Sequence, residues 1–355
     1  MIEQNALHHA EKCRFCWMCR HLCPVEHQTG REVNTPRAKG LLLSMVSKGT
    51  QAFDRDVASA MYECLLCDAC TNDCATGYQP PLFIRQARTE AVVNELAPKA
   101  VMDLIDNIDR TGNLYGEDKP SFGQEGQDVL VYIGEIAALR AQDMAKNFLT
   151  LPKKAGVSAK VLAQEPASGF LLGDLMGYTE EVRQHAVACA KALNETGLPV
   201  VVLDSYDAEI MTQKYPEWGC EITAGVTTAT AYAAELLRQG KIAPKAANGE
   251  KAACHDDDRL ARTFHEFEPI RALSRAAGFD LGEMFNRERL AKSCGTALAL
   301  AYMPELTVKI AAARWADLER VGCTTMVTAN PQAWLCLNQC VPADCHLADL
   351  YGALL

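Results

Sequence analysis

The chain has 355 residues, 49% of them hydrophobic and 23% charged, a composition that excludes a disordered or fibrous protein and allows two or three domains. Its net charge of −10 comes entirely from residues 101–355, because the first 100 residues contain 11 basic and 11 acidic side chains. This acidity disfavours nucleic acid or an anionic membrane surface as the main partner, and no apolar run approaches the roughly 20 residues of a transmembrane segment.

Residues 1–12 are polar and offer no apolar stretch for secretion, so we expect a cytoplasmic protein. In that reducing compartment the 16 cysteines indicate metal binding more than disulfide formation. Eight of the 16 fall within the first 74 residues, which makes the N-terminal part the candidate metal-binding region.

Two groups of four cysteines repeat one spacing, with two residues after the first and second cysteine and three after the third: Cys13, Cys16, Cys19 and Cys23, then Cys64, Cys67, Cys70 and Cys74. This is the run of bacterial-type ferredoxins, in which the fourth cysteine of each group binds the other cluster. Structural zinc sites usually take paired CxxC motifs instead, and scattered core cysteines would not repeat a spacing. The sequence therefore predicts two [4Fe-4S] clusters, one on Cys13, Cys16, Cys19 and Cys74, the other on Cys64, Cys67, Cys70 and Cys23.

The 40 residues between the two groups predict two helices, one with Pro36 in its first turn and one over residues 53–62. A compact βαβ ferredoxin has a shorter insert, so we expect an α-helical two-cluster ferredoxin domain. His21 lies between ligands, where an ordinary surface histidine is more typical than a proton relay. Four apolar residues between the ligands are expected to shield the clusters from water: Phe15, Trp17, Leu65 and Leu66.

After this domain, glycine and proline residues predict a linker over residues 101–127. From Asp128 onward, short apolar runs alternate with longer amphipathic stretches, as in an α/β module. The same order of elements occurs twice, so we expect a module of two similar halves. The predicted organisation is a ferredoxin domain over 1–100, the linker, a first half over 128–226, a connecting helix and loop over 227–250, and a second half over 251–355.

The first half is expected to contain strands over residues 129–133, 159–162 and 199–203 and helices over 137–149 and 182–193. The second half is expected to contain strands over 252–255, 279–284 and 324–328 and helices over 269–277 and 306–321, with the connecting helix over 227–239. No glycine-rich dinucleotide motif or phosphate-binding loop follows any of these strands, so bound NAD, FAD or ATP is not expected on this chain.

The segment from Cys13 to Pro24, with Asn34-Thr35-Pro36-Arg37, resembles the iron–sulfur oxidoreductases related to glycolate oxidase iron–sulfur subunits and heterodisulfide reductase catalytic subunits. The resemblance implies a helical two-cluster ferredoxin joined to two cysteine-rich CCG domains. In that family each CCG half supplies a Cys-Cys-Gly loop and further cysteines to another iron–sulfur cluster.

This chain departs from the CCG pattern at most of its cysteine positions. The loop Ala167-Ser168-Gly169 contains no cysteine, Asp204-Ser205-Tyr206-Asp207 replaces a later pair, and Asp258 stands at a further cysteine position. Ser293-Cys294-Gly295 keeps one cysteine of two. We therefore interpret the C-terminal module as a CCG-like repeat that has lost its cluster, since missing ligands outweigh a shared fold.

Three functions follow as hypotheses. The leading one is an electron-transfer subunit of an oxidoreductase complex, which passes single electrons between an FAD-dependent flavoprotein, of the type that oxidises 2-hydroxy acids in the related family, and another acceptor. The substrate site is then expected on another subunit. The alternatives are a heterodisulfide-reductase-like catalytic subunit that uses Cys294, and a non-redox assembly scaffold with structural clusters.

Two other groups of residues have a less specific pattern. Cys336, Cys340 and Cys345 match no zinc or iron–sulfur spacing, and their role stays open. Three consecutive acidic residues are more typical of a helix cap than of a cation site: Asp256, Asp257 and Asp258.

Overall fold

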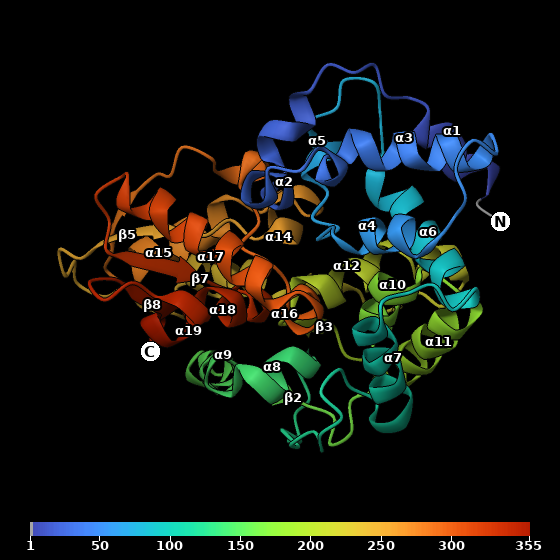
Figure 1. Cartoon of the computed structure of the whole chain (residues 1–355). Coiled ribbons are helices and arrows are strands. Elements are labelled where there is room, and N and C mark those ends of the chain that lie inside the picture. Colours follow the sequence, from blue (N-terminus) through green and yellow to red (C-terminus); the bar gives the residue numbers. More distant parts are fainter. Residues whose placement is uncertain (1–2) are drawn as a thin grey trace.

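The N-terminal part of the protein consists of helices, drawn in blue to cyan in Figure 1, and contains the two cysteine groups. The computed structural model describes residues 3–355, so the first two residues of the predicted ferredoxin domain lie outside the described residues. The two expected helices are confirmed as α3 (Pro36–Ser47) and α4 (Arg55–Tyr62). Thr35 and Asp54 cap them, because each side chain accepts a backbone N–H of the first turn at 3.1 and 3.0 Å.

The other elements of this part are short except for α6. They are α1 (Gln4–Ala10), η1 (Met18–Leu22), α2 (Pro24–Thr29), η2 (Glu32–Asn34), α5 (Ala69–Asn72) and α6 (Pro80–Val93).

A helix occupies the first part of the segment for which the sequence predicted a linker. This helix, α7 (Lys99–Thr111), buries Val101, Ile105 and Ile108 on one face and ends at Gly112, whose φ of 73° favours glycine. The three apolar residues recur at helical spacing, so α7 packs into the core and the irregular connection is confined to residues 112–128.

The first sheet has four parallel strands in the order β2-β1-β3-β4. Its central strands, β1 (Val129–Tyr132) and β3 (Val200–Val202), are fully buried apolar runs, as expected for parallel strands covered on both faces. The edge strands are β2 (Ala159–Lys160) and β4 (Val226–Thr228). The accompanying helices are α8 (Glu135–Arg140), α9 (Gln142–Lys154), α10 (Phe170–Met176), α11 (Glu180–Asn194), α12 (Ser205–Gln213), η3 (Pro216–Trp218) and α13 (Ala229–Arg238).

The second sheet also has four parallel strands, in the order β6-β5-β7-β8. Its central strands are β5 (Lys251–Cys254) and β7 (Thr325–Thr328), and its edges are β6 (Asp280–Gly282) and β8 (His346–Asp349). The accompanying helices are α14 (Asp258–Arg262), α15 (Glu268–Ala276), η4 (Glu288–Leu290), α16 (Ala297–Tyr302), α17 (Pro304–Glu319), α18 (Pro331–Leu337), η5 (Asn338–Cys340) and α19 (Leu350–Leu354).

The expected strands are present, although β2 and β6 are shorter than predicted. The helix predicted over 137–149 is two helices, α8 and α9, because the chain breaks at Ala141, whose φ of −137° and ψ of 47° are not helical. The fourth strand of each sheet, β4 or β8, was not predicted.

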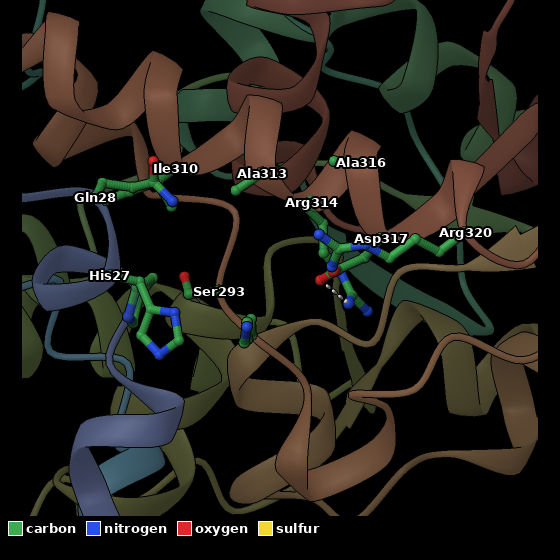
Figure 2. A pocket seen from close by; sticks show the side chains of 11 residues that line it. His27, Gln28, Ser293, Ile310, Ala313, Arg314, Ala316, Asp317 and Arg320 are labelled. Atoms are coloured by element: carbon green, nitrogen blue, oxygen red, sulfur yellow. Dashed lines mark hydrogen bonds and ion pairs between the residues drawn. The ribbon is translucent and has the colours of Figure 1, made fainter.

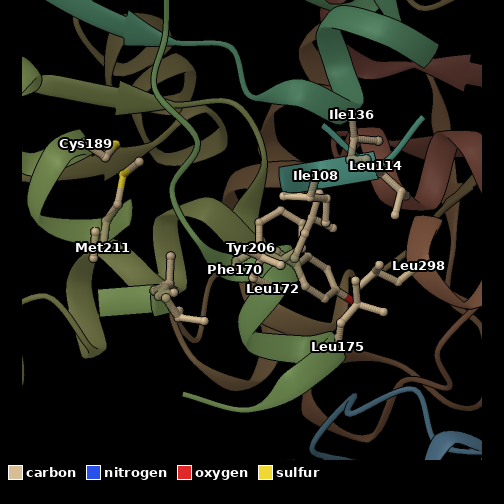
Figure 3. Close-up of a cluster of buried hydrophobic side chains, with 14 of the residues drawn as sticks. Ile108, Leu114, Ile136, Phe170, Leu172, Leu175, Cys189, Tyr206, Met211 and Leu298 are labelled. Carbon is tan, nitrogen blue, oxygen red and sulfur yellow. The ribbon is translucent and has the colours of Figure 1, made fainter. Parts of the chain in front are cut away.

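Two large hydrophobic clusters hold the parts together. One cluster includes residues of both sheets, such as Val201 of β3 and Val327 of β7. The other joins α7 to the first sheet's helices and to Leu298 of α16, as Figure 3 shows for Ile108, Phe170 and Leu298. Within residues 3–355, no helix is both long and apolar enough to cross a membrane.

Candidate metal centres

The eight N-terminal cysteines line two separate cavities. Cys13, Cys16, Cys19 and Cys74 surround the first cavity, and Cys23, Cys64, Cys67 and Cys70 surround the second. The fourth cysteine of each group therefore lies with the first three of the other group. This grouping is the one that cluster binding in two-cluster ferredoxins requires; the ligand role of each cysteine stays a prediction.

The backbone has the same unusual conformation in both cysteine groups. Phe15 and Leu66, each two residues after the first cysteine, have φ values of 57° and 53°, and Trp17 and Asp68 have values of 67° and 63°. Left-handed conformations are costly for such side chains. They turn the Phe15 and Leu66 amides toward the sulfurs of the first cysteines, each at 3.4 Å, where an N–H group stabilises a thiolate.

Burial raises the pKa of several of these thiols. It raises the pKa of Cys23 to about 11 and the pKa values of Cys19 and Cys67 to about 12. For Cys74 burial also acts to raise the pKa, but hydrogen bonds from Thr76 and nearby amides outweigh it and lower that pKa. Because iron binds thiolates, cluster insertion must displace the protons of these buried thiols.

Buried cations lie beside the second cavity. Lys39 is 2% exposed and interacts electrostatically with Cys64 and Cys23. Arg88 donates a hydrogen bond to the Cys64 carbonyl oxygen at 2.7 Å, and Arg262 of α14 donates one to the Cys67 carbonyl oxygen at 2.7 Å. These positive charges suit a cluster that carries four thiolates.

The residues around the first cavity are more exposed than those around the second. Cys16 is exposed, and its neighbours Phe15, Trp17 and Met18 are 54%, 39% and 51% exposed. The prediction that Phe15 shields a cluster is wrong, because this side chain is largely exposed and does not line the cavity. Trp17 does line the cavity, and the Arg37 guanidinium stacks over the Phe15 and Trp17 rings at 4.8 and 4.2 Å from the ring centroids.

The corresponding residues of the second group behave as predicted. Leu65 and Leu66 are 4% and 1% exposed and cover the second cavity. His21 lies on the exposed side of η1.

The donor sets fit [4Fe-4S] clusters. Each cavity offers four sulfurs, one amide directed at a sulfur, and apolar or cationic surroundings. Among the described residues, no three His, Cys, Asp or Glu side chains come close enough together to hold a single metal ion.

In the C-terminal module, polar side chains at the positions compared above with cysteines form hydrogen bonds with one another. Ser168 pairs with Asp207, and Ser205 donates a hydrogen bond to Asp257 at 2.5 Å. Asp258 accepts hydrogen bonds from Ser293 at 2.6 Å and from Arg262 at 2.7 Å. This network places hydroxyl and carboxyl groups at these positions, and among the described residues only the Asp207 Oδ2 atom of the named pairs lacks a hydrogen-bond partner.

The three consecutive acidic residues have structural partners. Asp257 caps α14, as predicted, by accepting the amides of residues 259 and 260 at 3.0 and 3.1 Å. Asp256 forms an ion pair with Arg271 at 2.7 Å, and Asp258 pairs with Arg262.

The remaining C-terminal cysteines belong to an apolar core. Cys294 is 2% exposed, and burial followed by the nearby Cys336 raises its pKa well above the ordinary value. This thiol has the wrong environment for a nucleophile, which disfavours the hypothesis of a disulfide-reducing site. The core around Trp315 also contains the group whose role the sequence left open: Cys336, Cys340 and Cys345.

Comparisons with known proteins agree with the N-terminal centres. Residues 9–78 match the family described as "4Fe-4S dicluster domain". The chain is 24% identical over 275 residues to a "Probable iron-sulfur-binding oxidoreductase FadF" of Bacillus subtilis, an alignment that covers 70% of this chain and 38% of that protein. It is also 24% identical over 271 residues to a "Probable membrane-anchored ferredoxin" of Chromohalobacter salexigens, covering 70% of this chain and 39% of that protein.

The chain therefore spans less than two fifths of the length of these curated relatives. A solved structure, that of a hypothetical protein from Helicobacter pylori, shares the fold with a TM-score of 0.60 and 12% identity. The alignment covers 99% of this chain and 72% of that one. Such low identity shows a common fold alone.

Proposed function

We propose that this chain, which is related to the iron–sulfur oxidoreductases, is an electron-transfer subunit that carries two [4Fe-4S] clusters. It passes single electrons between a flavoprotein dehydrogenase, of the FAD-linked 2-hydroxy-acid type, and a second acceptor. The observation that carries the proposal is the pair of cavities, each lined by four cysteines from both groups. Two one-electron centres convert the two-electron chemistry of a flavin into single steps.

The two centres differ in their access to solvent, which supports a path through the protein. The first centre reaches the surface at Cys16, where a partner's redox group can approach. The second is enclosed by Leu65, Lys39 and Arg262 against the α/β module. Electrons therefore enter or leave at the first centre, and the second centre relays them toward a partner bound near the module.

The C-terminal module is proposed to be a pair of CCG-like halves without a cluster. The same strand order in both sheets supports this proposal, and so does the polar network at the family's cysteine positions. Its role is then docking, in which it holds the ferredoxin domain against the partner subunits. The domain limits of 1–100, 128–226 and 251–355 and the cytoplasmic location remain part of this proposal.

The ligand sets are tested by removing one crossing cysteine at a time. Cys74→Ser is expected to abolish the cluster of the first cavity, and Cys23→Ser the cluster of the second, so each variant keeps about half of the iron and a different electron paramagnetic resonance signal. Cys220→Ser is the matched control, because Cys220 lies in neither cavity. Loss of the same signal in both variants would show that the crossed assignment is wrong.

The function is tested on two separate samples of the anaerobically purified, oxidised chain: one undergoes reductive titration, and the other is mixed with a reduced flavoprotein that co-purifies with it. We expect the chain to take up about two electrons, one for each cluster, and the flavoprotein to reduce it. Clusters that stay oxidised at every accessible potential would favour the scaffold hypothesis instead.

A further inference from the structure

A cavity of about 160 Å³ lies between helix α2 of the ferredoxin part and α17, the longest of the helices that accompany the second sheet. Figure 2 shows His27 and Gln28 of α2 on one side and Arg314 of α17 on the other. Lys292 and Ser293, from the loop before α16, complete the wall. None of these residues has a part in the proposed electron path, so the cavity is a separate feature.

Arg314 presents an unsatisfied donor at this cavity. Its side chain is 1% exposed, and among the described residues its Nη2 atom has no hydrogen-bond partner. The other two nitrogens are engaged, because Nε lies 3.3 Å from His255 Nδ1 and Nη1 lies 3.4 Å from an Asp317 oxygen. A buried N–H group without a partner costs free energy, which an acceptor bound in the cavity would recover.

The cavity also has an excess of positive charge. Three cationic side chains line it, Lys292, Arg314 and Arg320, against one carboxylate, Asp317. Asp317 is already shared between the two arginines, at 3.4 Å from Arg314 and 2.7 Å from Arg320. Within residues 3–355, the half-buried Lys292 ammonium forms no hydrogen bond or ion pair. Two positive donors are therefore left for an anion.

Beside the polar side chains of His27, Gln28 and Ser293, part of the cavity wall is apolar. Pro24, Ile310 and Ala313 contribute hydrocarbon surface. A hydrated inorganic ion gains no binding free energy from contact with such a surface. A short carbon chain would bury apolar area there. The lining thus combines a cationic end with an apolar side, as small-molecule sites do.

We propose that this cavity binds a small organic carboxylate, whose carboxylate group lies between Arg314 Nη2 and Lys292 and whose carbon chain lies along Pro24, Ile310 and Ala313. The ligand would contact both the ferredoxin part and α17. Since Pro24 directly follows Cys23, the bound anion would lie beside the second cluster centre.

Isothermal titration of the full chain, with its clusters, tests the proposal with propionate as the probe. We expect saturable binding of one propionate per chain, weaker binding of phosphate, and no binding of the neutral analogue propionamide. Lys292→Gln is expected to weaken propionate binding about tenfold or more, the effect of losing one charge-assisted hydrogen bond. Lys309→Gln is the control, because this exposed lysine of α17 does not line the cavity.

Unchanged propionate affinity in Lys292→Gln would overturn the assignment, as would the absence of any saturable binding. Phosphate that binds more tightly than propionate, or propionamide that binds equally well, would overturn the proposed ligand class. Lys292→Gln is chosen because its side chain is only half-buried, whereas loss of the buried Arg314 could disturb folding. Arg320→Gln, at a 73% exposed side chain, provides a second folded variant with a smaller expected loss of affinity.

Discussion

Replacing Lys39 by methionine is expected to lower the reduction potential of the second cluster. The ammonium group is buried, with 2% of the residue exposed, and its electrostatic partners are the thiols of Cys64 and Cys23. Reduction adds one negative charge to the cluster, and a nearby cation stabilises the reduced form more than the oxidised form. Methionine is unbranched like lysine and only one atom shorter, and it removes that charge.

The size of the shift in reduction potential follows from the charge interaction between the buried Lys39 ammonium and the electron added to the second cluster. Two unit charges about 6 Å apart in an effective dielectric constant of about 20 interact by about 3 kcal/mol. Since about 1.4 kcal/mol corresponds to about 59 mV for a one-electron couple, Lys39→Met should lower the potential by on the order of 100 mV. Solvent screening reduces this value little, because the side chain is enclosed.

A redox titration followed by electron paramagnetic resonance measures the potential of each cluster separately. Lys39→Arg keeps the positive charge and should leave the potential near its original value, and Lys99→Met removes an exposed lysine that pairs with Asp103 on α7. A potential that is unchanged or higher in Lys39→Met, with full iron content, would refute the electrostatic reasoning.

Three further predictions concern the α/β module. Arg262→Met removes the ion-pair partner, at 2.7 Å, of the buried Asp258 and should lower the free energy of unfolding, measured by urea denaturation, by about 3–5 kcal/mol. Adding Asp258→Asn should recover most of that loss, and no recovery would refute the importance of this ion pair. Burial raises the pKa of Glu135 to about 7, above an unfolded value of about 4.3. The protonated Glu135 carboxyl therefore contributes its full stabilisation below about pH 4, and this stabilisation is lost as the pH rises through about 7. In Glu135→Gln the melting temperature should therefore fall less steeply between about pH 5 and pH 8. An unchanged slope would contradict the raised pKa of Glu135. Cys294→Ser should leave iron content and electron transfer intact, and loss of either would revive the disulfide-reductase hypothesis.

The cysteine groups were predictable from the sequence because their geometry is local. Each triplet of candidate ligands lies within seven residues, and the chain wraps around the cavity by left-handed turns at fixed positions such as Phe15 and Leu66. The central strands β1 and β7 were predictable for a similar reason, since each is a short, fully buried run.

Two of the four edge strands, β4 and β8, were not predicted, because tertiary pairing defines them. β8 begins with the exposed His346 and has no fully buried residue, so its sequence lacks the pattern of a strand. Only its parallel pairing with β7, which begins with His346 opposite Thr325, places it in the sheet. The stacking of Arg37 over the Trp17 ring likewise joins two residues that are 20 positions apart in the sequence.

The cavity beside α17 could not be predicted from the sequence either. Lys292 and Arg314 are 22 positions apart in the sequence, and neither belongs to a recognisable motif. Their common cavity arises from the packing of α2 against α17, which periodicity alone does not reveal.

The most direct test of the proposed function is the amount of iron and acid-labile sulfide in the chain after strictly anaerobic purification. Two cubanes predict about eight iron and about eight sulfide per chain, with a brown colour and two sets of reduced [4Fe-4S] resonances. A colourless preparation that contains zinc instead of iron, or one in which the eight cysteines form disulfides, would contradict the account.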